Sequence, residues 1–205
     1  DWRHSTASWP DAMHMFPVET ARLEMRAISA TDEALFAQLY TDEETMRFIG
    51  APLSPERAAG SFRAALAGMR RSPIERLFLT VIEKASGTDV GICSLQNCDL
   101  HRRSVQAGVM FVSDARARGY SKEVFITLIP RVFAELPVDE LWVQFDAGHM
   151  AVQRAVISVG FTRCQQDGLE AGPRQHSVWS VRRDTWVAPR RETRIPDDIS
   201  ARKQA

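Results

Sequence analysis

The sequence lacks a surplus of either charge, since 26 basic side chains stand against 26 acidic ones. A chain without net charge has no broad field to attract nucleic acid or an anionic membrane surface, so neither is expected as a partner. It also lacks an apolar run near the ~20 residues that a membrane-spanning helix needs. We find no internal repeat and no low-complexity block. These absences argue against fibrous, disordered and membrane-spanning classes.

Cysteine is scarce, and the three present are Cys93, Cys98 and Cys164. An odd number in a chain of this size argues against a secreted disulfide framework and indicates thiols in a reducing compartment. Cys93 and Cys98 have no partnering Cys or His pair at zinc-ligand spacing, so no metal site is expected. The cytoplasm is the expected location.

What is present has the composition of an ordinary soluble domain. The 205 residues, 23.1 kDa in mass, are 44% hydrophobic and 25% charged, which is long and apolar enough to bury a core. We expect an N-terminal extension over residues 1–17, one domain over 18–187 and a flexible tail over 188–205. Residues 1–15 lack the continuous apolar stretch of a signal peptide, and the tail has many charges and few core formers.

Hydrophobic periodicity and turn residues predict an alternation of strands and helices. Strands are expected at 22–27, 77–84, 90–96, 104–112, 141–145, 161–164 and 177–181, and helices at 31–40, 42–49, 54–69, 121–136 and 151–159. Pro130 is expected to kink or break the fourth of these helices near Ile129, because proline lacks the N–H that a helix interior uses. This order predicts a mixed α/β fold, with a mostly antiparallel central sheet and helices on both of its faces.

The stretch over 108–124 carries the clearest chemical signal. A buried-looking strand runs into a basic loop that leads directly into a helix. The first N–H groups of a helix have no partner inside it, and they lie at the positive end of the helix dipole. A phosphate or pyrophosphate fits there, with Gly119 permitting close backbone approach and Arg116 and Arg118 adding charge. A basic loop before a helix is also typical of a solvated turn that binds no ligand.

Three stretches together resemble one family of enzymes. The loop Arg116-Ala117-Arg118-Gly119-Tyr120-Ser121 resembles the Arg/Gln-x-x-Gly-x-Gly/Ala loop that binds the coenzyme A pyrophosphate in GNAT acyltransferases, most of all in the branch of the ribosomal-protein N-terminal (Rim-type) acetyltransferases. Residues 19–26 are similar to that branch's opening strand, and residues 149–161 to its late helix and following strand. The resemblance covers about residues 18–186 and implies the GNAT acyl-CoA N-acyltransferase fold.

The sequence departs from the family pattern at several of these positions. Ala117 stands where the first loop glycine is expected, and Ser121 stands at the final small position; both side chains are small enough for phosphates to approach. On the late helix, His149 replaces the family's asparagine, which contacts the pantetheine arm, and Val152 replaces its serine. His149 can still donate a hydrogen bond to the cofactor, or it can be a surface or helix-cap histidine.

The resemblance implies direct transfer of an acyl group from its coenzyme A thioester to an acceptor, usually an amine, and we expect the acyl group to be acetyl. The pantetheine would run along Met110, Phe111 and Val112, and the N–H of Phe111 or Val112 would polarise the thioester carbonyl. The cofactor-binding residues implied are therefore these three, Arg116 to Ser121, and His149. No metal is implied.

The proton donor of many relatives, a tyrosine near position 156, is absent, because Val156 and Ile157 occupy that place. Gln106 falls near a glutamate common in the family and cannot act as a base. The remaining candidates are His149, Asp146, His101 and a chain of waters. His149 is the first choice for a catalytic residue, since an unperturbed imidazole titrates near neutrality. Positioning alone could also suffice.

The acceptor remains open among a protein N-terminus, a lysine side chain and a small amine. The cluster Asp42, Glu43, Glu44 and Arg47 could attract a cationic acceptor, or be only a solvated helix start. An acceptor other than an amine and a longer acyl chain also remain open, as does the choice between monomer and homodimer. The competing hypothesis is a catalytically inactive GNAT-fold module that binds an acyl-CoA or another partner.

Overall fold

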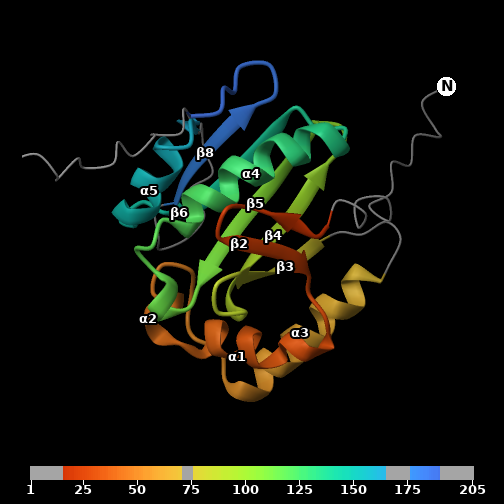
Figure 1. Ribbon diagram of the computed structural model, residues 1–205, viewed down its shortest axis with the longest axis vertical. Helices are drawn as coiled ribbons and strands as arrows, with labels where there is room; N and C mark the ends of the chain where they lie inside the picture. Colours follow the sequence, from red (N-terminus) through yellow and green to blue (C-terminus); the bar gives the residue numbers. More distant parts are fainter. Residues whose placement is uncertain (1–15, 71–75, 165–175, 190–205) are drawn as a thin grey trace, which may run out of the picture.

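In the described part of the chain, an eight-stranded sheet carries helices on both faces, as the computed structural model shows (Figure 1). The structure describes residues 16–70, 76–164 and 176–189. The described strands lie in the order β1-β2-β3-β4-β5-β6-β8-β7, and among them β5 and β6 are the one parallel pair. The mixed, mostly antiparallel α/β fold expected from the sequence is therefore confirmed.

The strands are β1 (Val18–Glu19), β2 (Leu23–Ala27), β3 (Arg76–Glu83), β4 (Thr88–Asp99), β5 (Ser104–Phe111), β6 (Glu140–Asp146), β7 (Thr162–Arg163) and β8 (His176–Arg182). The helices are α1 (Glu33–Thr41), α2 (Glu43–Met46), α3 (Pro55–Met69), α4 (Tyr120–Glu135) and α5 (Met150–Ile157), with short 3-10 turns η2 (Ala30–Asp32) and η3 (Ser113–Ala115).

Alternation along β3 builds a core on each face of the sheet. Leu77 and Leu79 are buried in the larger core, which α4 and α5 cover. Phe78, between them, points to the opposite face, where it packs in a second core with Phe36 of α1 and Phe62 of α3. Burial of each such side chain contributes about 1.5–3 kcal/mol, so both helix layers are firmly held.

Local sequence explains most helix boundaries, with one correction. Ser54 caps α3 by accepting a hydrogen bond from the Arg57 N–H, and Pro55 occupies the first turn, as its sequence predicts. Of the kink or break expected at Pro130, the break is wrong, because α4 continues through the proline to Glu135. Pro130 is exposed, whereas Ile129 and Val132 on either side are buried in the larger core. Packing on both sides of the proline therefore outweighs the one lost hydrogen bond.

The parallel pair β5 and β6 diverges along its length. Its register joins Ser104–Gln106 to Glu140–Trp142. Beyond that point β5 continues to Phe111 and β6 to Asp146, and each pairs there only with its other neighbour, β4 and β8 respectively, among the described strands. The last residues of β5 thus present an edge without a strand partner on the side of β6. This edge leads directly into the basic loop before α4.

The extension over 1–17 and the tail over 188–205 fall almost wholly outside the described residues. Within the described part, Trp186 packs against the larger core and donates its indole N–H to the Val159 carbonyl at 2.9 Å. None of the described helices combines the length and the apolar character that crossing a bilayer would require.

Candidate functional site

The loop between β5 and α4 has a backbone shaped by two left-handed residues. Ala117 has φ +57° and Gly119 has φ +78°. Glycine adopts this conformation without the steric cost that a Cβ imposes, whereas Ala117 accepts that cost. Gly119 occupies the N-cap position of α4, and no side chain caps the helix there. The first N–H groups of this 16-residue helix are therefore left to a partner outside it.

Arg116 is engaged with the protein rather than projecting freely from the loop. Its Nη2 lies 3.2 Å from Asp42 Oδ2 and also donates to the Thr45 hydroxyl, while its Nε donates to the Phe111 carbonyl at 3.4 Å. The side-chain hydrogen bond from Thr45 is the main cause that lowers the pKa of Asp42, with Arg116 adding to it. Arg116 thus ties the loop to α2.

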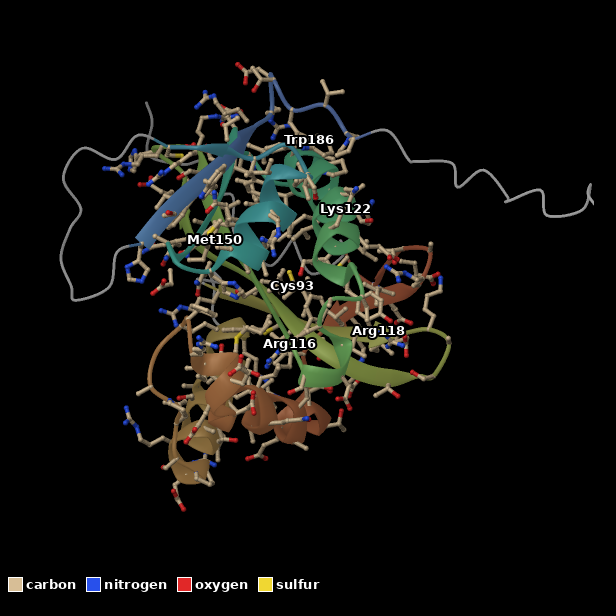
Figure 2. The ribbon with its side chains drawn as sticks, turned by 90° about the vertical axis from the view of Figure 1, so that its left-hand side faces the viewer. Cys93, Arg116, Arg118, Lys122, Met150 and Trp186 are labelled. Atoms are coloured by element: carbon tan, nitrogen blue, oxygen red, sulfur yellow. The ribbon has the colours of Figure 1, made fainter. Side chains whose placement is uncertain are left out.

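Arg118 and Tyr120 converge on a single carboxylate. Glu83 accepts from Arg118 Nη1 at 2.8 Å and from the hydroxyl of Tyr120, whose ring is buried. This hydrogen bond raises the pKa of Tyr120 and lowers that of Glu83. Figure 2 shows Arg116, Arg118 and Lys122 following one another along the loop and the first turn of α4. Ser121 lies half-buried in that turn.

The two N–H groups at the end of β5 face opposite ways. Val112 donates its N–H to the Val90 carbonyl of β4 at 3.0 Å, so it is unavailable to a ligand. Because N–H directions alternate along an antiparallel strand, the Phe111 N–H points away from β4, toward the diverging β6. Of the two thioester-polarising donors expected from sequence, Phe111 is the one whose geometry permits the role. Met110 lies partly buried on the second core.

His149 lies directly before α5, at the end of the loop that follows β6. Its ring packs on Phe48, with ring centroids 4.2 Å apart. Burial is the main cause that lowers the pKa of His149; the Asp146 carboxylate opposes this shift, and Arg116 and Arg47 reinforce it. The imidazole is therefore neutral at pH 7, and a neutral imidazole can accept a proton.

Other residues singled out from sequence lie elsewhere or are already engaged. His101 lies in the turn between β4 and β5, at the far end of β5 from Phe111, so it is too remote to share the site. Gln106 accepts a hydrogen bond from Asn97 at 2.6 Å. Glu44 pairs with Arg47 at 3.6 Å. No group of His, Cys, Asp or Glu in the described ranges could hold a metal ion.

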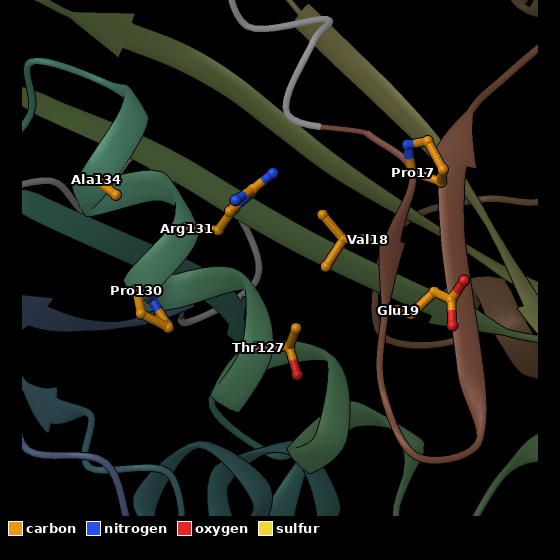
Figure 3. Close-up of a pocket in the computed structure, with 7 residues that line it drawn as sticks. All are labelled: Pro17, Val18, Glu19, Thr127, Pro130, Arg131 and Ala134. Carbon is orange, nitrogen blue, oxygen red and sulfur yellow. The ribbon is translucent and has the colours of Figure 1, made fainter.

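A hollow of ≈ 500 Å³ lies apart from this loop, between β1 and α4 (Figure 3). Its lining is mainly apolar and comes from Pro17, Val18, Glu19, Thr127, Pro130, Arg131 and Ala134. The carboxylate of Glu19 is held by Lys84 at 2.9 Å. With no convergent set of polar groups, the hollow lacks the chemistry that the β5–α4 loop offers.

Sequence reasoning missed three groups near the candidate site. Arg22, directly before β2, donates to the Arg118 carbonyl of the loop, and Glu123 of α4 holds Arg22. Phe48 packs on His149. Arg22 lies in the stretch that resembles the family's opening strand, but this resemblance assigned no role to the residue. Phe48 carried no signal, because nothing local shows which ring a distant imidazole meets.

Comparison with known proteins places these features in a family context. The family model described as an acetyltransferase (GNAT) domain matches residues 22–162. The match confirms the resemblance drawn from the three sequence stretches. No curated protein matches the sequence significantly.

Solved structures of acetyltransferases share the fold at low sequence identity. The ribosomal-protein α-N-acetyltransferase RimL, solved with coenzyme A, has a TM-score of 0.68 at 11% identity, covering 81% of this chain and 97% of its own. Spermidine N-acetyltransferase from Vibrio cholerae, solved with coenzyme A and spermine, has 0.68 at 11% identity, covering 80% and 97%. The microcin self-immunity acetyltransferase MccE, solved with acetyl-CoA and AMP, has 0.67 at 10%, covering 79% and 93%.

Proposed function

The chain belongs to the GNAT acetyltransferase family, and we propose that it transfers the acetyl group of acetyl-coenzyme A directly to an amine. In such a transfer the amine nitrogen bonds to the acyl carbon, the carbon–sulfur bond breaks, one proton leaves the amine and one reaches the thiolate. The observation that carries the proposal is the uncapped, left-handed loop at the N-terminus of α4, beside the unpaired edge of β5.

We assign the pyrophosphate to the backbone of Arg116, Ala117, Arg118, Gly119, Tyr120 and Ser121. The fit rests on N–H groups and the helix dipole more than on side-chain charge, because Arg116 and Arg118 are both paired with carboxylates. The open space at Gly119 supports this assignment, since the nearest group to a side chain added there is Arg22 Nη2, at 3.8 Å.

We assign the pantetheine arm to the edge formed by Met110, Phe111 and Val112. The N–H of Phe111 would hold the thioester carbonyl oxygen and stabilise the negative charge that it gains. Val112 would line this edge without donating a hydrogen bond to the cofactor, since its N–H is bound to β4. A hydrogen bond of this kind, fixed in advance by the strand, loses no energy to reorganisation when the charge develops.

His149 is proposed both as a contact for the pantetheine and as the group that takes a proton from the incoming ammonium. Its lowered pKa supports the second role, because the neutral ring is the form that accepts a proton. Neither tyrosine of the chain offers an alternative acid at this place. Tyr120 is bound to Glu83, and Tyr40 packs on Phe36 with its pKa raised by burial.

The acceptor is proposed to be a primary amine on a protein N-terminus, a lysine or a small molecule. The names of the similar structures include a ribosomal-protein acetyltransferase and a spermidine acetyltransferase, so the fold accommodates both kinds of acceptor. We propose a cytoplasmic location, because the odd number of cysteines and the buried Cys93, with a thiol pKa raised to about 12 by burial, do not suit a disulfide framework.

Calorimetry with acetyl-CoA followed by a thiol-release assay on a panel of amines tests the proposal. We expect binding and amine-dependent release of coenzyme A. Binding without turnover on any amine would instead support an inactive acyl-CoA-binding module. The observation that favours this second candidate is Val156, which is buried where many relatives have a catalytic tyrosine.

A further inference from the structure

The carboxylate of Glu123 fastens the first turn of α4 to the segment before β2. Its Oε1 accepts from the Thr20 hydroxyl at 2.5 Å and from the Arg22 N–H at 2.8 Å. Its Oε2 accepts from Arg22 Nε at 2.8 Å and lies 2.7 Å from Arg22 Nη2. Backbone and guanidinium of one arginine are thus held by one carboxylate, whose side chain is only 17% exposed.

The same guanidinium continues into the loop. Arg22 Nη1 donates to the Arg118 carbonyl at 3.0 Å, and the guanidinium carbon lies 4.7 Å from the centre of the Tyr120 ring. Its Nη2 is also the nearest group to the open side of Gly119. Arg22 therefore contacts the loop at Arg118 and Tyr120, the residues on either side of Gly119.

We propose that Arg22 and Glu123 are positioning residues that hold the β5–α4 loop in the shape in which its N–H groups meet the cofactor's phosphates. This inference rests on the proposed function. The planar fork of arginine matches a carboxylate with two parallel hydrogen bonds, and its remaining nitrogen fixes the carbonyl of Arg118. A lysine ammonium carries the same charge but cannot make this set of contacts at once.

If Glu123 acted only through its charge, the variant Glu123→Gln would change the affinity for coenzyme A in the opposite direction. Glu123 is an anion in the first turn of α4, close to where phosphates would bind, so removal of its charge would favour phosphate binding by electrostatics. Removal of the carboxylate also releases Arg22 from the loop. If position dominates, Glu123→Gln weakens the binding of coenzyme A; if charge dominates, it strengthens that binding.

Calorimetry with coenzyme A on Arg22→Lys, Glu123→Gln and wild type tests this inference. We expect each variant to raise the Kd about tenfold, which corresponds to 1.4 kcal/mol. The control is Glu19→Gln, which removes the ion pair with Lys84 from the neighbouring strand β1 without touching the loop, and its Kd should stay within about twofold of wild type.

A second readout separates positioning from general loss of structure. S-acetylpantetheine lacks the phosphates, so its turnover by Arg22→Lys and Glu123→Gln should equal that of wild type. An equal loss of turnover with acetyl-CoA and with S-acetylpantetheine would overturn the positioning role. Wild-type affinity for coenzyme A in Arg22→Lys, or tighter binding in Glu123→Gln, would also overturn it. If Glu123→Gln does not fold, Arg22→Lys decides the question alone. A wild-type chain that binds no coenzyme A would overturn the proposed function itself.

Discussion

Arg116 and Asp42 form an ion pair, 3.2 Å between Nη2 and Oδ2, that joins segments 74 residues apart in the chain. One partner belongs to the loop assigned to the pyrophosphate, and the other is the N-cap of α2, in the acidic cluster considered for the acceptor. If the pyrophosphate binds at this loop as proposed, phosphate and Asp42 would compete for one guanidinium. Binding of the cofactor to Arg116 would leave the Asp42 carboxylate facing solvent or the acceptor.

This competition predicts that Asp42→Asn tightens the binding of coenzyme A. Asparagine is as good an N-cap as aspartate, so α2 keeps its hydrogen bond from the Thr45 N–H. Loss of the charge frees Arg116 for phosphate, and we expect a roughly two- to fivefold lower Kd, the range of a partly exposed ion pair. Glu44→Gln is the matched control, since its partner is Arg47. Weaker binding in Asp42→Asn would show that the ion pair organises the site instead.

Replacement of Gly119 by valine should weaken coenzyme A binding by about 2–3 kcal/mol, the scale of losing hydrogen bonds to a charged group. A branched side chain resists φ +78° and would also occupy the space left for the phosphates. Gly160→Val is the control, because Gly160 has φ +96° after α5, and the nearest group to a side chain added there is Trp186, outside the loop.

Calorimetry on both valine variants gives the answer. The Gly160 variant should lose stability and keep its affinity for coenzyme A. Equal affinity of the wild type and Gly119→Val would show that this loop is not the pyrophosphate site.

Much of this arrangement is visible in the sequence because it is local. The β5–α4 loop, the cap at Ser54 and the alternation of Leu77 and Phe78 all follow from neighbouring residues. The partners of the loop do not, since Arg22 and Glu123 are 101 residues apart and meet only in the folded chain. The direction of the Val112 N–H likewise depends on the register of β5 against β4.

A different prediction concerns the pH dependence of kcat/KM. The pKa of His149 is lowered from its ordinary value of 6.5, so the neutral base persists to lower pH. If His149 takes the amine proton, kcat/KM should fall as the pH drops through a value below 6.5, and His149→Ala should lower kcat by ~10²-fold. No limb from a tyrosine near pH ~10 is expected.

The variant His149→Asn separates the two proposed roles. Asparagine keeps a hydrogen-bond donor for the pantetheine but cannot take a proton near neutrality. If His149→Asn restores the KM for acetyl-CoA to the wild-type value but leaves kcat as low as in His149→Ala, proton transfer by His149 is supported. Full rescue of both would limit His149 to the cofactor contact, and wild-type values in the alanine variant would exclude both roles.

Gly91 of β4 is expected to be essential for the position of Phe111. A Cβ there would meet the Met110 carbonyl and come within 2.7 Å of the Phe111 ring. We expect Gly91→Ala to destabilise the fold by about 1–3 kcal/mol in urea unfolding, as overpacking does. In the control Gly60→Ala, nothing lies within 4 Å of the added methyl in α3, and alanine should stabilise by about 0.5–1 kcal/mol. No loss in Gly91→Ala would mean that β5 has room to shift.

The most direct test of the central claim is a titration of the labelled chain with coenzyme A, followed through its backbone amide NMR signals. If the loop at the N-terminus of α4 binds the pyrophosphate and the edge of β5 binds the pantetheine, the largest shifts fall on Gly119, Tyr120, Ser121 and Phe111. Val112, already bound to Val90, shifts less. Shifts centred on the hollow around Thr127 and Ala134, or no shifts at saturating coenzyme A, would contradict this account.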